Sequence, residues 1–370
     1  MIIKNGIVFT EDGTFEEKEL YIEGGRFVAG MDEVEDQTVL DVEGNLILPG
    51  LVDVHSHGAA GNDFCDGDVE KLKGILAYEK SCGITSYCPT SMTLSKERLK
   101  DIFATVKEIQ PSEELARIVG INMEGPFVSE KKKGAQNGKY IVHPDAAFFY
   151  ECNEASGHKI KLVTLAPEQE GSEAFIRQVG KEVGISIGHT DADYDTAKKA
   201  FDLGADHVTH LFNAMPSFLH RNPGVIGAAA DSSHCMPEII SDGLHVHPSV
   251  VRTAFRIFGP ERMILISDSM RATGLEDGTY EFGGQMVYVK DKKATLEDGT
   301  IAGSTTNLYD CMCRAMTFGI PKADAIFAAT RNPAKSIGVY DQVGSIAPGK
   351  RADFLIVDQE FHLREVYMLK

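Results

Sequence analysis

Short apolar runs alternate with longer amphipathic stretches through most of the chain, and this alternation limits the folds available to it. The stretches with helical periodicity include Val69–Lys80, Lys96–Glu108, Ser172–Val183, Asp193–Leu203 and Ser249–Phe258. Eight runs have the length and composition of buried strands, namely Val52–His57, Thr85–Thr90, Val119–Gly125, Leu162–Ala166, Ile185–His189, His207–Phe212, Glu238–Asp242 and Met263–Asp268. Strands separated by helices form parallel sheets, and eight such units close into a barrel. We therefore predict an α/β fold with a (β/α)8 barrel of the TIM type over residues 50–343.

The two ends of the chain have a different texture, with short alternating runs and turns in place of helices. Asn5-Gly6 and Gly24-Gly25 mark turns in the first segment, and Asp353–Val357 has the pattern of a strand in the last. We predict that residues 1–49 and 344–370 pair into one small β-sandwich domain beside the barrel. The segment Tyr280–Gly299 has glycine-containing turns and predicts a hairpin inserted after the last barrel strand.

The charge and the cysteines restrict the partners and the compartment. The formal net charge is −18, which argues against nucleic acid or an anionic membrane as a partner. A phosphorylated small molecule stays compatible, because one arginine or histidine can hold a phosphate inside an acidic protein. No run approaches the roughly 18 consecutive apolar residues of a membrane helix, and the start MIIKNGIVFTEDG lacks the pattern of a signal peptide. The seven cysteines include no C-x-x-C pair, so we expect reduced thiols in a cytoplasmic protein.

Polar residues gather where the predicted strands end, which is the side of a (β/α)8 barrel that carries chemistry. The first strand ends in DVHSH, and side chains alternate along a strand, so His55 and His57 share the face that points into the barrel mouth. Glu124 ends the third strand before Gly-Pro, a costly place for a carboxylate without a partner. His189 and His210 end the fifth and sixth strands, and Asp268 ends the eighth.

Any one of these residues, taken alone, is more often an ordinary hydrogen-bonded polar residue, but the set of six at five strand ends indicates a metal centre. Imidazoles combined with carboxylates suit zinc, iron, manganese or cobalt. Glu124, His189 and His210 can hold one ion, and His55 and His57 could hold a second, with Glu124 or Asp268 between them. Bound water then approaches a pKa of about 7, and Asp268 fits a general base. The pattern predicts metal-assisted hydrolysis or deamination.

These residues lie in motifs that resemble a known family over essentially the whole chain. The chain is identified as a member of the amidohydrolase superfamily by LPGLVDVHSHG and GSIAPGKRADFLIVD. It resembles most closely the N-acetylglucosamine-6-phosphate deacetylase family, through MEGPFVS, KGAQNGKY, GHTDADY, THLFNAM, RNPGVIGAA, SDGLHVHP and LISDSMRATG. The resemblance implies hydrolysis of the acetamide of an amino sugar phosphate, with release of acetate and with one or two divalent ions per subunit.

The resemblance also implies individual roles. Glu124, His189 and His210 would bind the main metal, and Asp268 would be the catalytic acid/base residue. Substrate would contact Asn213 and Ala214 of the H-L-x-N-A-M motif, the His of DGLH (His245), and an arginine from a neighbouring subunit of a homodimer, Arg221, at the phosphate. His234 and His247 have no implied role, and we interpret them as structural.

Two positions bear on how closely the chain follows this family. Some members replace the H-x-H pair by Gln- and Asn-type residues and use one metal, whereas His55 and His57 are both present here. The family usually has a histidine after the third strand that polarises the substrate carbonyl, and Gln136 stands at that position. A glutamine amide can donate a hydrogen bond to the carbonyl but carries no charge. His143, seven residues further on, could substitute for it if the loop folds back.

Three other functions are weighed against this one. N-acetylgalactosamine-6-phosphate is an alternative substrate, favoured by the change at Gln136. A catalytically idle sugar-phosphate-binding protein is a distant alternative, disfavoured by the complete ligand set and Asp268. Cyclic-amide hydrolases commonly bridge two metals with a carboxylated lysine at the end of the fourth strand, but KIKLVTLAPE has its lysines at the beginning.

Overall fold

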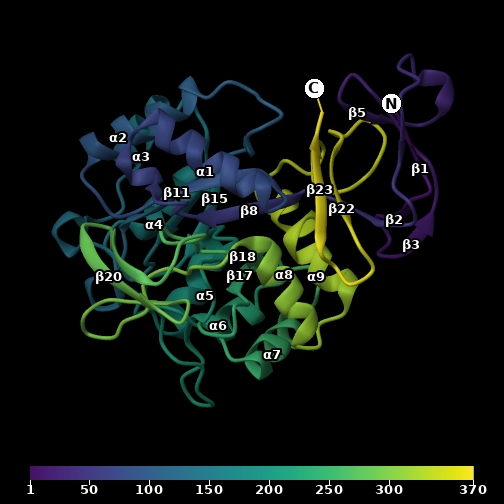
Figure 1. The fold of residues 1–370 in the computed structure, drawn as a ribbon. Coiled ribbons are helices and arrows are strands. Elements are labelled where there is room, and N and C mark those ends of the chain that lie inside the picture. The colour runs from purple at the N-terminus through teal and green to yellow at the C-terminus, as the bar shows by residue number, and fades with distance from the viewer. Residues whose placement is uncertain (370) are drawn as a thin grey trace.

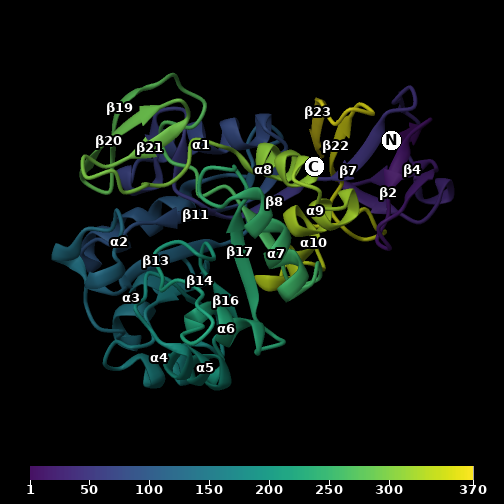
Figure 2. The same ribbon diagram turned by 90° about the horizontal axis from the view of Figure 1, so that it is seen from below.

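A computed structural model describes residues 1–369, so Lys370, the last residue of the predicted sandwich segment, lies outside the described residues. The central sheet has nine strands, one of which is the two-residue β12 (Arg117–Ile118) that pairs with β11. The other eight are parallel and follow the order β8-β11-β13-β14-β15-β16-β17-β18 (Figures 1 and 2). Their bounds are Leu51–Ser56, Ile84–Ser91, Ile121–Phe127, Ile160–Leu165, Gly184–Ile187, His207–Val208, Met236–Ile240 and Ile264–Ile266. The seam between β18 and β8 is closed by backbone hydrogen bonds from Asp268 N to His55 O (2.9 Å) and from His57 N to Ser269 O (2.8 Å). The predicted (β/α)8 barrel is confirmed.

The strands form where apolar and β-branched residues run together without turn residues, and each is buried along nearly its whole length. Helices pack around them and begin at side-chain caps, as Asp68, Ser95 and Asp193 show by accepting hydrogen bonds from backbone N–H groups of the first helical turn. The helices are α1 Val69–Ser81, α2 Lys96–Thr105, α3 Ala146–Ala155, α4 Ser172–Val179, α5 Tyr194–Leu203, α6 Gly224–Ala230, α7 Pro248–Phe258, α8 Leu308–Thr317, α9 Lys322–Ala329 and α10 Arg331–Ser336. None of those helices is long and apolar enough to cross a membrane.

Three of the strands that bear site residues end earlier than predicted. His189, His210 and Asp268 have left-handed φ angles of 46°, 28° and 48°, so the chain leaves the sheet just before each of them. Such angles are uncommon for residues with a Cβ and often accompany functional sites. The alternation of apolar and polar residues cannot predict these left-handed φ angles, because each one affects the backbone of a single residue at the edge of the sheet.

The two chain ends lie together at one side of the barrel, as the neighbouring N and C labels in Figure 1 show. They share a five-stranded sheet, β23-β22-β7-β2-β3, and a four-stranded sheet, β5-β4-β1-β6, comes from the first segment alone. Buried side chains such as Ile3, Ile47 and Phe354 form a separate apolar core there. The strands are β1 Ile2–Lys4, β2 Ile7–Phe9, β3 Phe15–Glu17, β4 Leu20–Glu23, β5 Arg26–Val28, β6 Val39–Asp41, β7 Leu46–Pro49, β22 Asp353–Val357 and β23 Leu363–Met368. The division into domains at residues 49/50 and 343/344 stays a prediction.

The insertion predicted as a hairpin over Tyr280–Gly299 is a three-stranded antiparallel sheet. Its strands are β19 Gly278–Phe282, β20 Gln285–Lys290 and β21 Lys293–Thr295. Phe282, Val287 and Ala294 share a small apolar core with Met92 and Met270, which follow barrel strands β11 and β18. The insertion is therefore fixed beside the carboxyl ends of the strands.

Candidate functional site

A cavity of about 450 Å³ opens at the carboxyl ends of the barrel strands. Its walls come from the ends of strands far apart in the sequence and from the inserted sheet. The lining includes His57, Glu124, Gln136, His189, His210, Asn213, Ala214, His245, Asp268 and Phe282. Most of the residues predicted from the strand ends are therefore gathered around one space of the size typical for a small-molecule site.

The first group of candidate metal ligands is Glu124, His189 and His210. Glu124 Oε1 lies 3.1 Å from Nε2 of His189 and 3.1 Å from Nε2 of His210, and the two Nε2 atoms are 3.1 Å apart. A tetrahedral ion with bonds of about 2.0 Å separates its ligand atoms by roughly 3.3 Å. The three atoms thus have the mutual spacing that one such ion requires.

The second group is His55, His57 and Glu124, and it uses the same carboxylate. His55 Nε2 lies 3.4 Å from Glu124 Oε1, and His57 Nε2 lies 3.4 Å from Glu124 Oε2. Asp268 Oδ1 is 3.2 Å from His57 Nε2 and 3.6 Å from His55 Nε2. Glu124 is therefore placed to serve both groups, with Asp268 beside the second.

Three of the imidazoles are held through their other nitrogen, which leaves Nε2 facing the carboxylates. His57 Nδ1 donates to Thr90 O (3.1 Å) and His189 Nδ1 to Lys132 O (3.0 Å). His55 Nδ1 donates to Glu238 Oε2 at 2.9 Å. Such outer partners fix the tautomer and the ring orientation of a metal-binding histidine. Glu238 was missed by reasoning from strand ends, although a glutamate inside the apolar strand MPEII is itself a signal of a buried partner.

Charge in the site is balanced between these carboxylates and histidines. Burial alone would raise the pKa of Glu124, but the charges of His189 and His55 and hydrogen bonds from His189 and His210 hold it well below the usual range. Burial opposes ionisation of Asp268 as well, yet the hydrogen bond from His57 and nearby histidine charges lower its pKa. Both carboxylates are thus ionised at neutral pH.

The donor set fits a divalent transition-metal ion. His55 Nε2 is buried without a hydrogen-bond partner among the described residues, although it points at two carboxylates. Buried polar atoms are rarely left unpaired, and those that are invite an explanation such as a bound ion. Imidazole nitrogens with carboxylate oxygens are the ligands that zinc, iron, manganese or cobalt accept.

The predicted substrate residues fall into two groups. Gln136 is buried in the cavity wall, where its Oε1 accepts from Thr93 N (2.6 Å) and its Nε2 donates to Glu124 Oε2 (2.6 Å). Asn213, Ala214 and His245 line the same cavity.

Arg221 and His143 are not in this cavity wall. Both are exposed, and an Arg221 guanidinium nitrogen contacts His220 Nε2 at 2.6 Å. Phe218 and Leu219 beside it are about half exposed, at 49% and 52%. Within a single chain, Arg221 therefore does not contribute to the site that its own barrel builds.

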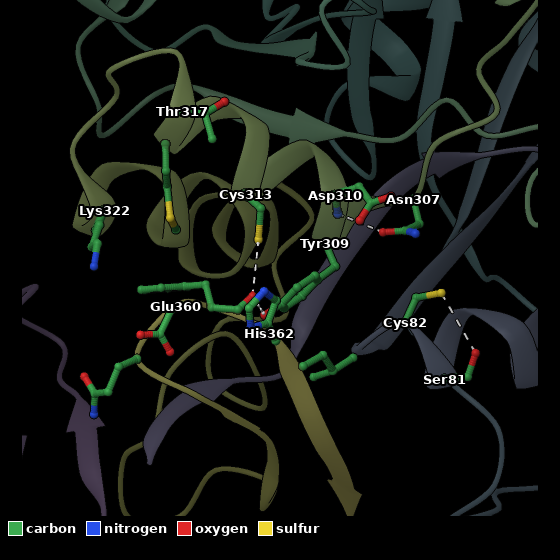
Figure 3. A pocket seen from close by; sticks show the side chains of 14 residues that line it. Ser81, Cys82, Asn307, Tyr309, Asp310, Cys313, Thr317, Lys322, Glu360 and His362 are labelled. Atoms are coloured by element: carbon green, nitrogen blue, oxygen red, sulfur yellow. Dashed lines mark hydrogen bonds between the residues drawn. The ribbon is translucent and has the colours of Figure 1, made fainter. Parts of the chain in front are cut away.

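A second cavity, of about 730 Å³, lies between α8, the end of α1 and the turn before β23 (Figure 3). A cluster at this turn, Asp358, Glu360 and His362, has metal-like spacing. However, the Asp358 carboxylate already accepts from His362 Nδ1 (2.9 Å) and from Arg364 (2.7 Å), and His362 and Glu360 are exposed. These hydrogen bonds stabilise the turn and account for the closeness of the three side chains without a metal ion.

Comparisons with known proteins find relatives along nearly the whole chain. The profile of the amidohydrolase family matches residues 46–368. The N-acetylglucosamine-6-phosphate deacetylase of Bacillus subtilis (strain 168) is 38% identical, with 97% of this chain and 90% of that protein covered. The N-acetylgalactosamine-6-phosphate deacetylase of Escherichia coli O157:H7 is 32% identical over 98% of this chain and 96% of that protein. A mutant N-acetyl-D-glucosamine-6-phosphate deacetylase from Mycobacterium smegmatis, solved in complex with N-acetyl-D-glucosamine-6-phosphate, superposes with a TM-score of 0.90 at 30% identity, covering 100% and 99% of the two chains.

Replacing Glu124 by glutamine should lower the metal content of the purified protein by more than about tenfold, because the amide loses the charge that both ligand groups share. Elemental analysis measures this directly. Glu79→Gln is the matched control, since Glu79 on α1 is also fully buried and belongs to neither group. An undiminished metal content in Glu124→Gln would contradict the ligand assignment.

Proposed function

Since this chain belongs to the amidohydrolase family, we propose that it hydrolyses the N-acetyl group of N-acetylglucosamine-6-phosphate to give glucosamine-6-phosphate and acetate. The observation that carries the proposal is the Glu124 carboxylate shared by four histidine nitrogens, with Asp268 3.2 Å from one of them. The same activity is named for relatives that match the chain over nearly its full length. In this proposal the enzyme hydrolyses the carbon–nitrogen bond of a linear amide.

The metal would be held by Glu124, His189 and His210, with His55 and His57 available for a second ion. Zinc, iron, manganese and cobalt all suit these ligands. When bound, the ion supplies a polarised substrate carbonyl and a water whose pKa falls towards about 7.

Asp268 is placed to move the proton that the reaction requires. It is ionised because its pKa is lowered, and its Oδ1 lies beside His57 at the edge of the cavity. We assign it the removal of a proton from the attacking water, which forms the new carbon–oxygen bond. The same carboxyl then gives that proton to the amine nitrogen as the carbon–nitrogen bond breaks.

Gln136 supplies an oriented hydrogen-bond donor to the acetyl group. Thr93 N fixes the amide oxygen, so the amino group must face Glu124. An amide nitrogen has two hydrogens, and the second stays free for the substrate carbonyl. We assign the neighbouring Asn213 and Ala214 to the sugar.

His245 suits the phosphate end of the substrate. Its Nδ1 donates to Asp242 Oδ2 at 2.7 Å, and although burial alone would lower the pKa of His245, this hydrogen bond and the charge of Asp242 raise it. An imidazole with a raised pKa is a better partner for a phosphate than a neutral one.

Arg221 would complete the phosphate site across a homodimer. The residue is exposed outside its own cavity and lies beside the exposed Phe218 and Leu219, apolar side chains that suit contact with a second copy. Its forked donors match phosphate.

All seven cysteines are free thiols, which supports our proposal that the protein acts in the reducing cytoplasm.

Acetate release from N-acetylglucosamine-6-phosphate in the presence of zinc tests the function. Asp268→Asn should lower kcat by about 10²- to 10⁴-fold, because the amide cannot accept the proton from water. Its metal content should stay near that of the unchanged protein. A metal-loaded protein that releases no acetate from any acetylated amino sugar phosphate would instead be a sugar-phosphate-binding protein.

The same assay with N-acetylgalactosamine-6-phosphate separates the two sugars, since one relative is named for that substrate. We expect a higher kcat/KM for the gluco sugar. The reverse order would assign the chain to the galacto substrate.

Arg221→Ala should raise KM for the phosphorylated substrate by more than about tenfold, since it removes a charged hydrogen bond worth roughly 1.5–3 kcal/mol. Activity on unphosphorylated N-acetylglucosamine should be nearly unchanged. An equal loss on both substrates would contradict the phosphate role. Sedimentation of the two proteins checks that the variant keeps its oligomeric state.

A further inference from the structure

Glu238 is a buried carboxylate at the site that the reaction itself does not use. It lies in the middle of β17 and has no exposed surface. Its Oε2 accepts hydrogen bonds from His55 Nδ1 at 2.9 Å and from the backbone N of His210 at 3.3 Å. No lysine or arginine among the described residues forms an ion pair with it. Since a buried carboxylate is costly without compensation, its contact with His55 requires an explanation.

The contact singles out His55 among the candidate ligands. His57 and His189 are oriented by backbone carbonyls, which are neutral acceptors. His55 is oriented by a carboxylate, and a charged acceptor makes a stronger hydrogen bond and a more basic ligand nitrogen. The more basic nitrogen of His55 strengthens the ligand group formed by His55, His57 and Glu124.

Glu238 also joins the two ligand groups. The backbone N–H that it accepts belongs to His210, a ligand of the first group that has a left-handed φ of 28°. This hydrogen bond is longer than the one from His55, and it involves the backbone and not the imidazole. The position of His55 therefore depends on Glu238 more directly than that of the His210 ring does.

We propose that Glu238 is a positioning residue that enables this chain to hold a second metal ion. It fixes the His55 ring with Nε2 towards Glu124 and Asp268, and it strengthens that nitrogen as a ligand. The inference rests on the proposed metal-dependent function, and it adds that occupancy of the second position depends on a residue outside the ligand set.

Metal titration of the chelator-treated protein tests this, with zinc or cobalt as the probe. The unchanged protein should bind two ions, and Glu238→Ala should bind one with nearly unchanged affinity. Glu238→Gln, which keeps the size and an acceptor oxygen, should weaken the second ion by about 10- to 100-fold. In cobalt-loaded protein, the visible absorption of the second ion should be lost in the same variants.

Two controls make the result specific. Glu79→Gln changes an equally buried glutamate whose carboxylate oxygens have no hydrogen-bond partner among the described residues, and it should keep both ions. His55→Ala should lose the second ion, and adding Glu238→Ala to it should cause no further loss. If Glu238→Ala does not fold, the same test is made with Glu238→Gln alone and with Glu238→Gln combined with His55→Ala.

Two ions at unchanged affinity in the Glu238 variants, or one ion in the unchanged protein, would overturn the inference. Acetate release by the unchanged protein is measured in parallel. If it deacetylates the sugar phosphate while the Glu238 variants keep both ions, this inference fails and the proposed function stands. If it neither binds metal nor releases acetate, the function itself fails.

Discussion

The site depends on one carboxylate that is buried inside a protein barrel. Glu124 lies within β13, which continues to Phe127 and so ends later than the sequence predicted, at the point where the register with β14 shifts. Its two oxygens are 3.1–3.4 Å from the Nε2 atoms of four histidines. Burying this charge would be prohibitive without those partners. The histidines in turn come from three other parts of the barrel, so none of them could reach Glu124 unless the strands were closed in the correct order. The pairing of this buried charge therefore depends on closure of the barrel, because an open barrel would leave the Glu124 carboxylate without its histidine partners.

The sequence predicted the members of this cluster because strand geometry is local. Alternation along β8 places His55 and His57 on one face, and the carboxyl ends of parallel strands meet at one side of a barrel. Those two rules suffice to gather residues separated by more than a hundred positions. The extent of the strands was predicted less well, since the strands before the left-handed residues His189, His210 and Asp268 end two, four and two residues earlier than predicted.

Contacts that depend on tertiary packing were not predictable in the same way. Gln136 was expected to face the substrate, but its hydrogen bonds to Thr93 and Glu124 depend on how the loop after β13 folds back. Glu238 sits on a strand whose periodicity predicts only burial, and its pairing with His55 joins strands on opposite sides of the seam strand β18. Helices α3, α6, α9 and α10 were not among the predicted helices, and the insertion proved to have a third strand.

The seam of the barrel also positions Asp268, to which we assign the proton transfer. Asp268 N donates to His55 O where the last strand meets the first, and the Asp268 carboxylate then lies 3.6 Å from the His55 imidazole. The other side of Asp268 is held by Ser304, whose N donates to Asp268 O at 2.7 Å after the chain returns from the inserted sheet. The ring centroids of Phe282 in that sheet and of His57 are 5.1 Å apart, and both side chains are buried. Closure of the barrel thus brings Asp268, the His55 and His57 imidazoles and the Phe282 ring together at the seam.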